Sequence, residues 1–252
     1  MAFIADYPGA IVVEAAQYGY GLWKNHPKAW CLHTPEEKPD DYPGTPYYFH
    51  NLTDRRASTT YFVSYLGLVF QCVPEGEGAY ANAREGIDGL FDWETPNWNL
   101  NLETLSVEIE GYAASIHITM PRSSPQWNAL VRLMAHRCLA LSIPPERTFG
   151  HYQVSKYRSD PGQLNIPAVI ADVKEEMMAL SAAAEAGIEA FFATPYTDMR
   201  GRTHESKASY LTLIGDWLDS VHLETLLAHT KNTPGSGGLT ADEVVDKLKS
   251  RL

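Results

Sequence analysis

The feature that most constrains the fold is an alternation of strand-like and helix-like segments between residues 28 and 175. Residues 28–34 (KAWCLHT) form a short apolar run, which is typical of a buried strand. Residues 104–109 (TLSVEI) predict a second strand, and residues 124–141 repeat apolar positions at helical spacing. Strands interleaved with helices predict an α/β fold with a mixed central β-sheet flanked by helices.

Further segments refine this prediction. Residues 59–65 and 68–73 are β-branched and aromatic, and the turn residue Gly67 between them favours a hairpin. Residues 148–151 indicate a short strand or the entry to a loop, and a helix is expected from Pro167 onward. Neither a GxGxxG fingerprint nor a GxxxxGK[ST] loop is present, so the sequence offers no nucleotide-binding motif.

The C-terminal part of the chain has a different composition and predicts an appendage. We expect one catalytic domain over residues 1–175, with an irregular lead-in over residues 1–27. Residues 176–230 are expected to form an α-helical extension, and residues 231–239 a flexible Gly-rich linker. Residues 240–252 begin with a capping box and carry a narrow apolar stripe. Because so short a helix is marginal alone in water, we expect it either to pack back on the core or to drive self-association, which would give a homo-oligomer through the C-terminal helices.

The charge balance argues against several classes of partner. The chain carries 31 acidic and 20 basic residues, a formal net charge of −11. Phosphate binding needs clustered positive charge, so no nucleic-acid partner is expected. No stretch approaches the ~18 apolar residues that span a bilayer, so membrane insertion is not expected either. The N-terminus has no positively charged region before an apolar run, which predicts no signal peptide and residence in the cytoplasm.

The three cysteines are Cys31, Cys72 and Cys138, far apart and without a CxxC pair. An odd number without a pattern argues against a disulfide framework and against a cysteine metal site. Their apolar neighbours predict buried free thiols in a reducing compartment.

Two of the nine histidines stand out by their position in the chain. His33 ends an apolar strand just before a loop, where α/β folds present chemistry. His151 precedes Asp160, whose Asp-Pro-Gly sequence predicts a tight turn that holds the carboxylate. Two neutral imidazoles and one carboxylate are a common catalytic zinc set that leaves a fourth position open for water. The alternative is that Asp160 only caps its turn.

A candidate general base lies in the strand SVEIEG. Glu108 and Glu110 lie on the face opposite Val107 and Ile109. A glutamate that projects from a central strand is costly to bury unless it is paired or functional. A carboxylate near an activated water would serve as the base for hydrolysis. The alternative is an edge strand whose polar face lies in water.

Five segments together resemble the N-acetylmuramoyl-L-alanine amidase type 2 family, which includes phage lysozymes, anhydro-muropeptide amidases and peptidoglycan recognition proteins. The similarity covers roughly residues 25–175 and keeps the order of the family's motifs. The segments are CLHT at 31–34, the hairpin at 58–75, LSVEIEG at 105–111, the helix and second histidine at 123–151, and SKYRSDPG at 155–162.

The resemblance implies a role for each matching residue. One Zn²⁺ would be held by His33, His151 and Asp160. Glu108 takes the place of the family's catalytic glutamate. Arg158 takes the place of a lysine that stabilises the oxyanion in many members, and arginine keeps the positive charge with a different reach.

The resemblance also implies the substrate, which is peptidoglycan cleaved at the amide between N-acetylmuramic acid and L-alanine. Tyr61, Tyr80 and Asn82 occupy substrate-facing motif positions of the family, with residues that differ from its usual ones. A cytoplasmic location fits a phage endolysin that acts on the wall after release, and it also fits a cytosolic wall-recycling amidase. The helical appendage, as a wall-targeting or oligomerising element, favours the endolysin. Two alternatives stay open: a non-catalytic peptidoglycan-binding protein of the same fold, and a wall-degrading component of a phage particle.

Overall fold

The computed structural model describes residues 3–19, 24–38, 44–82, 99–193, 196–197 and 203–204. The chain divides into two compact units. The first comprises Met1–Cys138 with Ile143–Lys174, and the second Leu139–Ser142 with Glu175–Leu252. The first unit holds the larger β-sheet and every candidate site residue.

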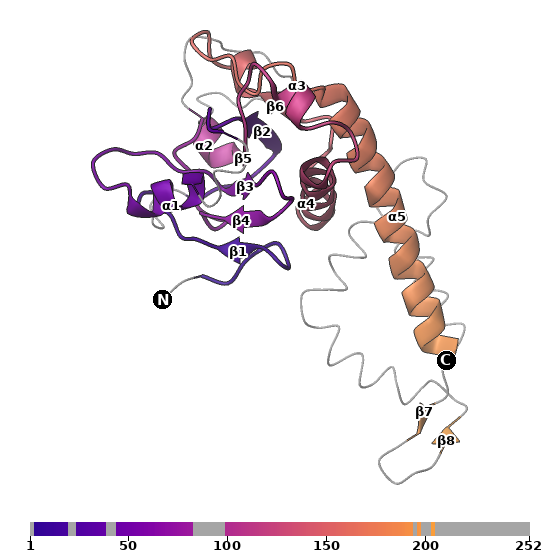
Figure 1. Cartoon of the computed structure of the whole chain (residues 1–252). Coiled ribbons are helices and arrows are strands. Elements are labelled where there is room, and N and C mark those ends of the chain that lie inside the picture. Colours follow the sequence, from indigo (N-terminus) through magenta and orange to yellow (C-terminus); the bar gives the residue numbers. More distant parts are fainter. Residues whose placement is uncertain are drawn as a thin grey trace. The chain divides into compact units, whose positions relative to one another are not determined.

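A mixed six-stranded sheet forms the centre of the first unit (Figure 1), with the strand order β1-β4-β3-β5-β2-β6. Its strands are β1 (Ile11–Val12), β2 (Ala29–His33), β3 (Tyr61–Val63), β4 (Val69–Gln71), β5 (Thr104–Ile109) and β6 (Thr148–Gly150). Strands β3, β5, β2 and β6 run parallel, whereas β4 runs antiparallel to β3. The carboxyl ends of β2, β5 and β6 therefore meet at one edge. This arrangement confirms the predicted mixed sheet and its hairpin.

The helices of the described chain are α1 (Gly44–Asn51), α2 (Leu100–Glu103), α3 (Ile116–Thr119), α4 (Pro125–Leu141) and α5 (Ile166–Ala193), with a 3-10 turn η1 (His151–Gln153). Helix α4 begins as predicted, because the Ser124 hydroxyl accepts a hydrogen bond from the Trp127 N–H at 3.2 Å. Within the described ranges no helix is long and apolar enough to cross a membrane.

The two faces of β2 have different neighbours. Trp30 faces α4, where its indole N–H donates to the Cys138 sulfur at 3.3 Å. Ala29 and Cys31 point to the opposite face and join a buried cluster there with Leu100, Phe149 and Val154. Since side chains alternate along a strand, His33 lies on this second face, away from α4.

The structure differs from the sequence prediction at both ends of the chain. Within the expected irregular lead-in, β1 pairs in parallel with β4, and a strand of two residues leaves no periodic pattern to detect. Helix α5 runs without a break through the boundary expected after residue 175, and the second compact unit resumes at Glu175. Beyond it, β7 (Tyr196–Thr197) and β8 (Thr203–His204) form an antiparallel pair, so these four residues are extended rather than helical. The expected linker and final helix lie outside the described residues.

All three thiols are free and buried, as predicted. Burial raises the pKa of Cys31 and raises the pKa values of Cys72 and Cys138 to about 12. Only the thiolate reacts with disulfide reagents, so the folded protein at pH 8 is expected to react at least ~100-fold more slowly than free cysteine. An absorbance assay with an aromatic disulfide, with and without denaturant, measures this. One fast-reacting equivalent in the folded protein would contradict the burial.

Candidate metal centre and active site

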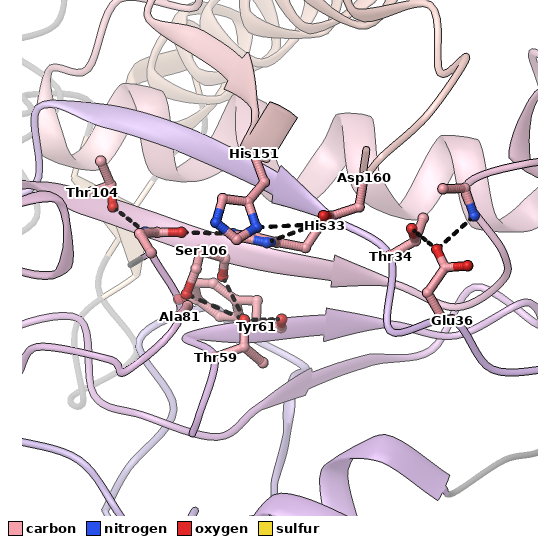
Figure 2. A network of polar contacts seen from close by, with 12 residues as sticks. His33, Thr34, Glu36, Thr59, Tyr61, Ala81, Thr104, Ser106, His151 and Asp160 are labelled. Carbon is pink, nitrogen blue, oxygen red and sulfur yellow. Dashed lines mark hydrogen bonds and ion pairs between the residues drawn. The ribbon is translucent and has the colours of Figure 1, made fainter. Parts of the chain in front are cut away.

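The structure brings His33, His151 and Asp160 together at the carboxyl edge of the sheet. His33 is the last residue of β2, and His151 follows the last residue of β6. Asp160 comes from the loop after η1, and Figure 2 shows its carboxylate beside both imidazole rings. One potential ligand atom from each of the three residues lies within 4.8 Å of the other two.

Both imidazoles approach the same carboxylate oxygen. The Asp160 Oδ2 atom lies 3.0 Å from His33 Nδ1 and 3.3 Å from His151 Nδ1. The two ring centroids are 4.4 Å apart, and the exposed fractions are 2% for His33, 3% for His151 and 9% for Asp160. Burial opposes the charge of Asp160, but the two adjacent imidazoles outweigh it and hold its pKa below the usual value. Burial lowers the pKa of His33, although the adjacent Asp160 carboxylate works in the opposite direction.

The predicted Asp-Pro-Gly turn is present, and backbone hydrogen bonds fix it on both sides. The Gly162 N–H donates to the Ser159 carbonyl at 2.7 Å, and the Tyr152 N–H donates to the Asp160 carbonyl at 2.9 Å. Gly162 has a φ of +63°, and a Cβ there would lie 2.0 Å from the Ala113 carbonyl oxygen. Only glycine fits this position, because a side chain would overlap backbone atoms.

Gly162→Ala is therefore expected to lower the free energy of unfolding by about 2 kcal/mol or more, because it adds left-handed backbone strain and a backbone clash. Gly76 is the matched control, since no atom lies within 4 Å of a Cβ there and its φ is not positive. Gly76→Ala is expected to stay within about 0.5 kcal/mol of the parent. Urea unfolding followed by circular dichroism measures both, and equal losses would contradict the close packing of the turn.

The three side chains fit a zinc ion in their chemistry and placement. Two imidazoles and one carboxylate converge on a small buried volume, which is the donor set of catalytic zinc sites with one open position. The His151 Nε2 atom is buried, and no hydrogen-bond partner is found for it in the described part of the chain. The polar atoms of this cluster are thus not fully satisfied by the protein, as expected where a cation completes the set.

Glu108 lies beside the three candidate ligands. It pairs in register with His33 on the adjacent parallel strand, so both side chains lie on one face of the sheet. Its side chain is half-buried, and its Oε2 atom is buried without a hydrogen-bond partner among the described residues. Burial, followed by the negative charge of Asp160, raises the pKa of Glu108 to about 8. A carboxyl group with a pKa near neutrality is suited to take up and release a proton.

Charged groups around Glu108 act in opposite directions. The positive charge of the exposed Arg158 lowers the pKa of Glu108, and the negative charges of Glu37 and Glu36 raise it. The Glu36 carboxylate is fixed in place, because it accepts hydrogen bonds from the Thr34 hydroxyl and from the Ala113 N–H, each at 2.8 Å. Figure 2 shows this contact next to the cluster. No sequence motif points to Glu36, which lies in a charged loop.

The three expected substrate-facing residues have different surroundings. Tyr61 is fully buried, and its hydroxyl donates to Glu75 at 2.8 Å, so its burial does not fit a substrate contact. Tyr80 is half-buried, with the Arg56 guanidinium 5.6 Å from its ring centroid. Asn82 is also buried, and its Oδ1 atom lies 2.6 Å from His33 Nε2. Asn82 thus contacts a candidate metal ligand, a role that no local sequence pattern indicates.

The sequence model of the family described as N-acetylmuramoyl-L-alanine amidase matches residues 16–163, more than half of the chain. This range contains all three candidate ligands, Glu108 and Arg158. A search of curated proteins finds no match.

Several solved structures are similar to this chain at low identity. A selenomethionine derivative of AmpD is 16% identical with a TM-score of 0.47, covering 68% of this chain and 99% of its own. A mutant of PlyL is 20% identical with a TM-score of 0.46, covering 66% and 98%. A mutant endolysin from Bacillus subtilis is 13% identical with a TM-score of 0.49, covering 65% and 97%. The match of the sequence model carries the assignment: the chain belongs to the Amidase_2 family of N-acetylmuramoyl-L-alanine amidases.

Proposed function

We propose that this protein is a zinc-dependent peptidoglycan hydrolase that cleaves the amide between N-acetylmuramic acid and L-alanine. Membership of the amidase family supports peptidoglycan amidase activity. The observation that carries the finer proposal is the convergence of His33, His151 and Asp160 beside a half-buried Glu108. A family member that only bound peptidoglycan would not require metal ligands beside a candidate general base.

His33, His151 and Asp160 would hold the zinc ion. When bound, zinc acts as a Lewis acid that lowers the pKa of a coordinated water and polarises a carbonyl group. The burial of the three side chains excludes bulk water and keeps their positions fixed. Such a preorganised site strengthens electrostatic interactions with a reacting amide.

Glu108 would move the proton in the reaction. In its ionised form the carboxylate accepts a proton from the attacking water, and it then passes this proton to the leaving amine of L-alanine. In this step a C–O bond forms between the water oxygen and the carbonyl carbon, and the C–N bond breaks. The proton taken from the water leaves with the amine. The pKa of Glu108 near 8 leaves part of the population ionised at neutral pH and keeps its conjugate acid able to donate.

Arg158 would stabilise the negative charge that develops on the scissile carbonyl oxygen. Its exposed guanidinium already acts on Glu108 electrostatically, which indicates that its charge reaches the site. Arg158→Gln is expected to lower kcat about 100-fold, the usual effect of removing one oxyanion donor. Arg158→Lys keeps the charge and is expected to retain most of the activity. Steady-state hydrolysis of a soluble muropeptide measures both, and equal losses in the two variants would rule out a role for the charge.

The reaction is tested by incubating the full chain with purified sacculi, with and without a chelator, and identifying the products by mass spectrometry. The proposal predicts chelator-sensitive release of peptides with a free L-alanine amino terminus. Binding to sacculi without release of products, even with added zinc, would favour the non-catalytic alternative. Cleavage within the stem peptide or the glycan would contradict the proposed bond.

We extend the proposal to phage-driven lysis of a bacterial host, with the protein held in the host cytoplasm until release. What supports this is the helix α5, which continues to Ala193, well beyond the matched region, as an appendage to the amidase unit. By analogy, appended modules often direct lytic enzymes to the wall. Purified protein added to permeabilised cells is expected to clear the suspension. Activity only within an assembled phage particle would favour the particle-component alternative.

A further inference from the structure

His33 lies between two polar partners, one at each ring nitrogen. Its Nδ1 faces Asp160 Oδ2 at 3.0 Å, and its Nε2 faces Asn82 Oδ1 at 2.6 Å. A neutral imidazole carries a single proton, and only the nitrogen without it has a lone pair for a metal. The partner at Nε2 therefore decides which nitrogen can serve as a ligand.

The orientation of the Asn82 amide is fixed from its other side. The Asn82 Nδ2 atom donates to the Thr104 hydroxyl oxygen at 2.6 Å. That hydroxyl gives its only proton to the Leu100 carbonyl at 2.6 Å, so toward Asn82 it can only accept. An NH₂ group must then face Thr104, which turns the amide oxygen toward His33.

We propose that Asn82 and Thr104 are positioning residues that fix the His33 tautomer, with the proton on Nε2 and the lone pair of Nδ1 directed at the metal. The Asn82 oxygen has no proton to give, so the short contact requires His33 to be the donor. Without a cation, the free lone pair of Nδ1 would face a carboxylate oxygen, which is unfavourable. A metal ion held by both residues would remove this repulsion. The relay of Thr104, Asn82 and His33 thus prepares the ring for the ion.

The relay is protected from solvent and held by the backbone. The exposed fractions are 2% for His33, 3% for Asn82 and 2% for Thr104, so water does not compete for these hydrogen bonds. The Asn101 side chain accepts hydrogen bonds from the backbone N–H groups of Asn82, at 2.7 Å, and Ala81, at 3.2 Å. Helix α2 and the start of β5 thus anchor the loop that carries Asn82.

The inference rests on the metal centre of the proposed function, and its test separates the two. Zinc affinity of the full chain is measured by competition with a chromophoric chelator for the wild type and four variants. Asn82→Leu removes the acceptor and is expected to bind zinc 10–100-fold more weakly, the usual effect of losing such a partner. Thr104→Val frees the Asn82 amide to rotate and is expected to reduce zinc affinity by a smaller factor. Thr104→Ser keeps the hydroxyl and is expected to keep the wild-type zinc affinity.

Asn25→Leu is the matched control for the loss of a buried amide. Asn25 is 5% exposed and its Nδ2 atom donates to the Thr104 carbonyl at 3.0 Å, but no contact joins it to His33 in the described structure. Its replacement is expected to leave zinc affinity unchanged. If Asn82→Leu fails to fold, the contrast between Thr104→Val and Thr104→Ser still decides the question.

The tautomer itself is read from ring nitrogen chemical shifts of ¹⁵N-histidine-labelled protein loaded with zinc. The proposal predicts a protonated Nε2 and a metal-bound Nδ1 for His33, and loss of the protected Nε2–H signal in Asn82→Leu. A proton on Nδ1, wild-type affinity in a folded Asn82→Leu variant, or an equal loss in Asn25→Leu would overturn the inference alone. A wild-type chain that binds no zinc would overturn the metal centre as well.

Discussion

His151→Ala is expected to abolish both zinc binding and amide hydrolysis. His151 supplies one of the three candidate ligands, and its ring is 3% exposed and 4.4 Å from the ring of His33. Two remaining side chains cannot complete a catalytic zinc set, which needs three protein ligands and an open position. Metal content of the purified variant and its release of L-alanine amino termini from sacculi are the two measurements, and both should fall below detection.

His136→Ala serves as the matched control for this variant. His136 is a half-buried ring that packs edge-on against Tyr7 at 5.3 Å between ring centroids, and it takes no part in the ligand cluster. Its replacement is expected to reduce stability modestly while the bound zinc and the hydrolysis persist. Hydrolysis by a metal-free His151→Ala protein would refute the role given to this cluster.

Glu108→Gln is expected to lower kcat by about 10²–10⁴-fold, the usual contribution of a positioned general base. The amide has nearly the same shape as the carboxylate but cannot accept and return a proton. Because Glu108 is not one of the three ligands, the zinc content should stay at the wild-type level. Metal analysis combined with single-turnover kinetics on a soluble muropeptide separates this loss from a loss of metal.

Glu110→Gln is the control from the same segment of chain. Glu110 is 1% exposed, and its carboxylate accepts a hydrogen bond from the Tyr65 N–H at 2.6 Å. This contact holds the hairpin loop to the end of β5, so Glu110→Gln should change stability more than kcat. If the two variants lost activity equally, burial of a carboxylate in this segment rather than its chemistry would explain the effect.

The sequence was informative where a local pattern determines the structure. The apolar run that ends at His33 and the alternation around Glu108 depend only on neighbouring residues, and both form strands of the predicted sheet. The Asp-Pro-Gly turn at Asp160 is equally local. Once these elements join a parallel sheet, their carboxyl ends must meet, so the composition of the candidate metal centre could be predicted without coordinates.

Contacts between distant residues could not be predicted in this way. Asn82 meets His33 across 49 positions in the sequence, and nothing in the residues around Asn82 indicates which side chain it will face. Tyr61 was expected to contact substrate, but the alternation of β3 turns it toward the Arg137–Glu75 ion pair beneath α4. The choice between these two faces depends on register across three strands, which no single segment encodes.

The most direct test of the proposed zinc amidase is a titration of the metal-free protein. The full chain is stripped with a chelator, and its release of L-alanine amino termini is followed as zinc is added in small steps. The proposal predicts no hydrolysis at the start, a linear rise and a plateau at about one zinc ion per chain, as expected for a single site with three protein ligands. Full hydrolysis by the stripped protein, unchanged by added zinc, would contradict it.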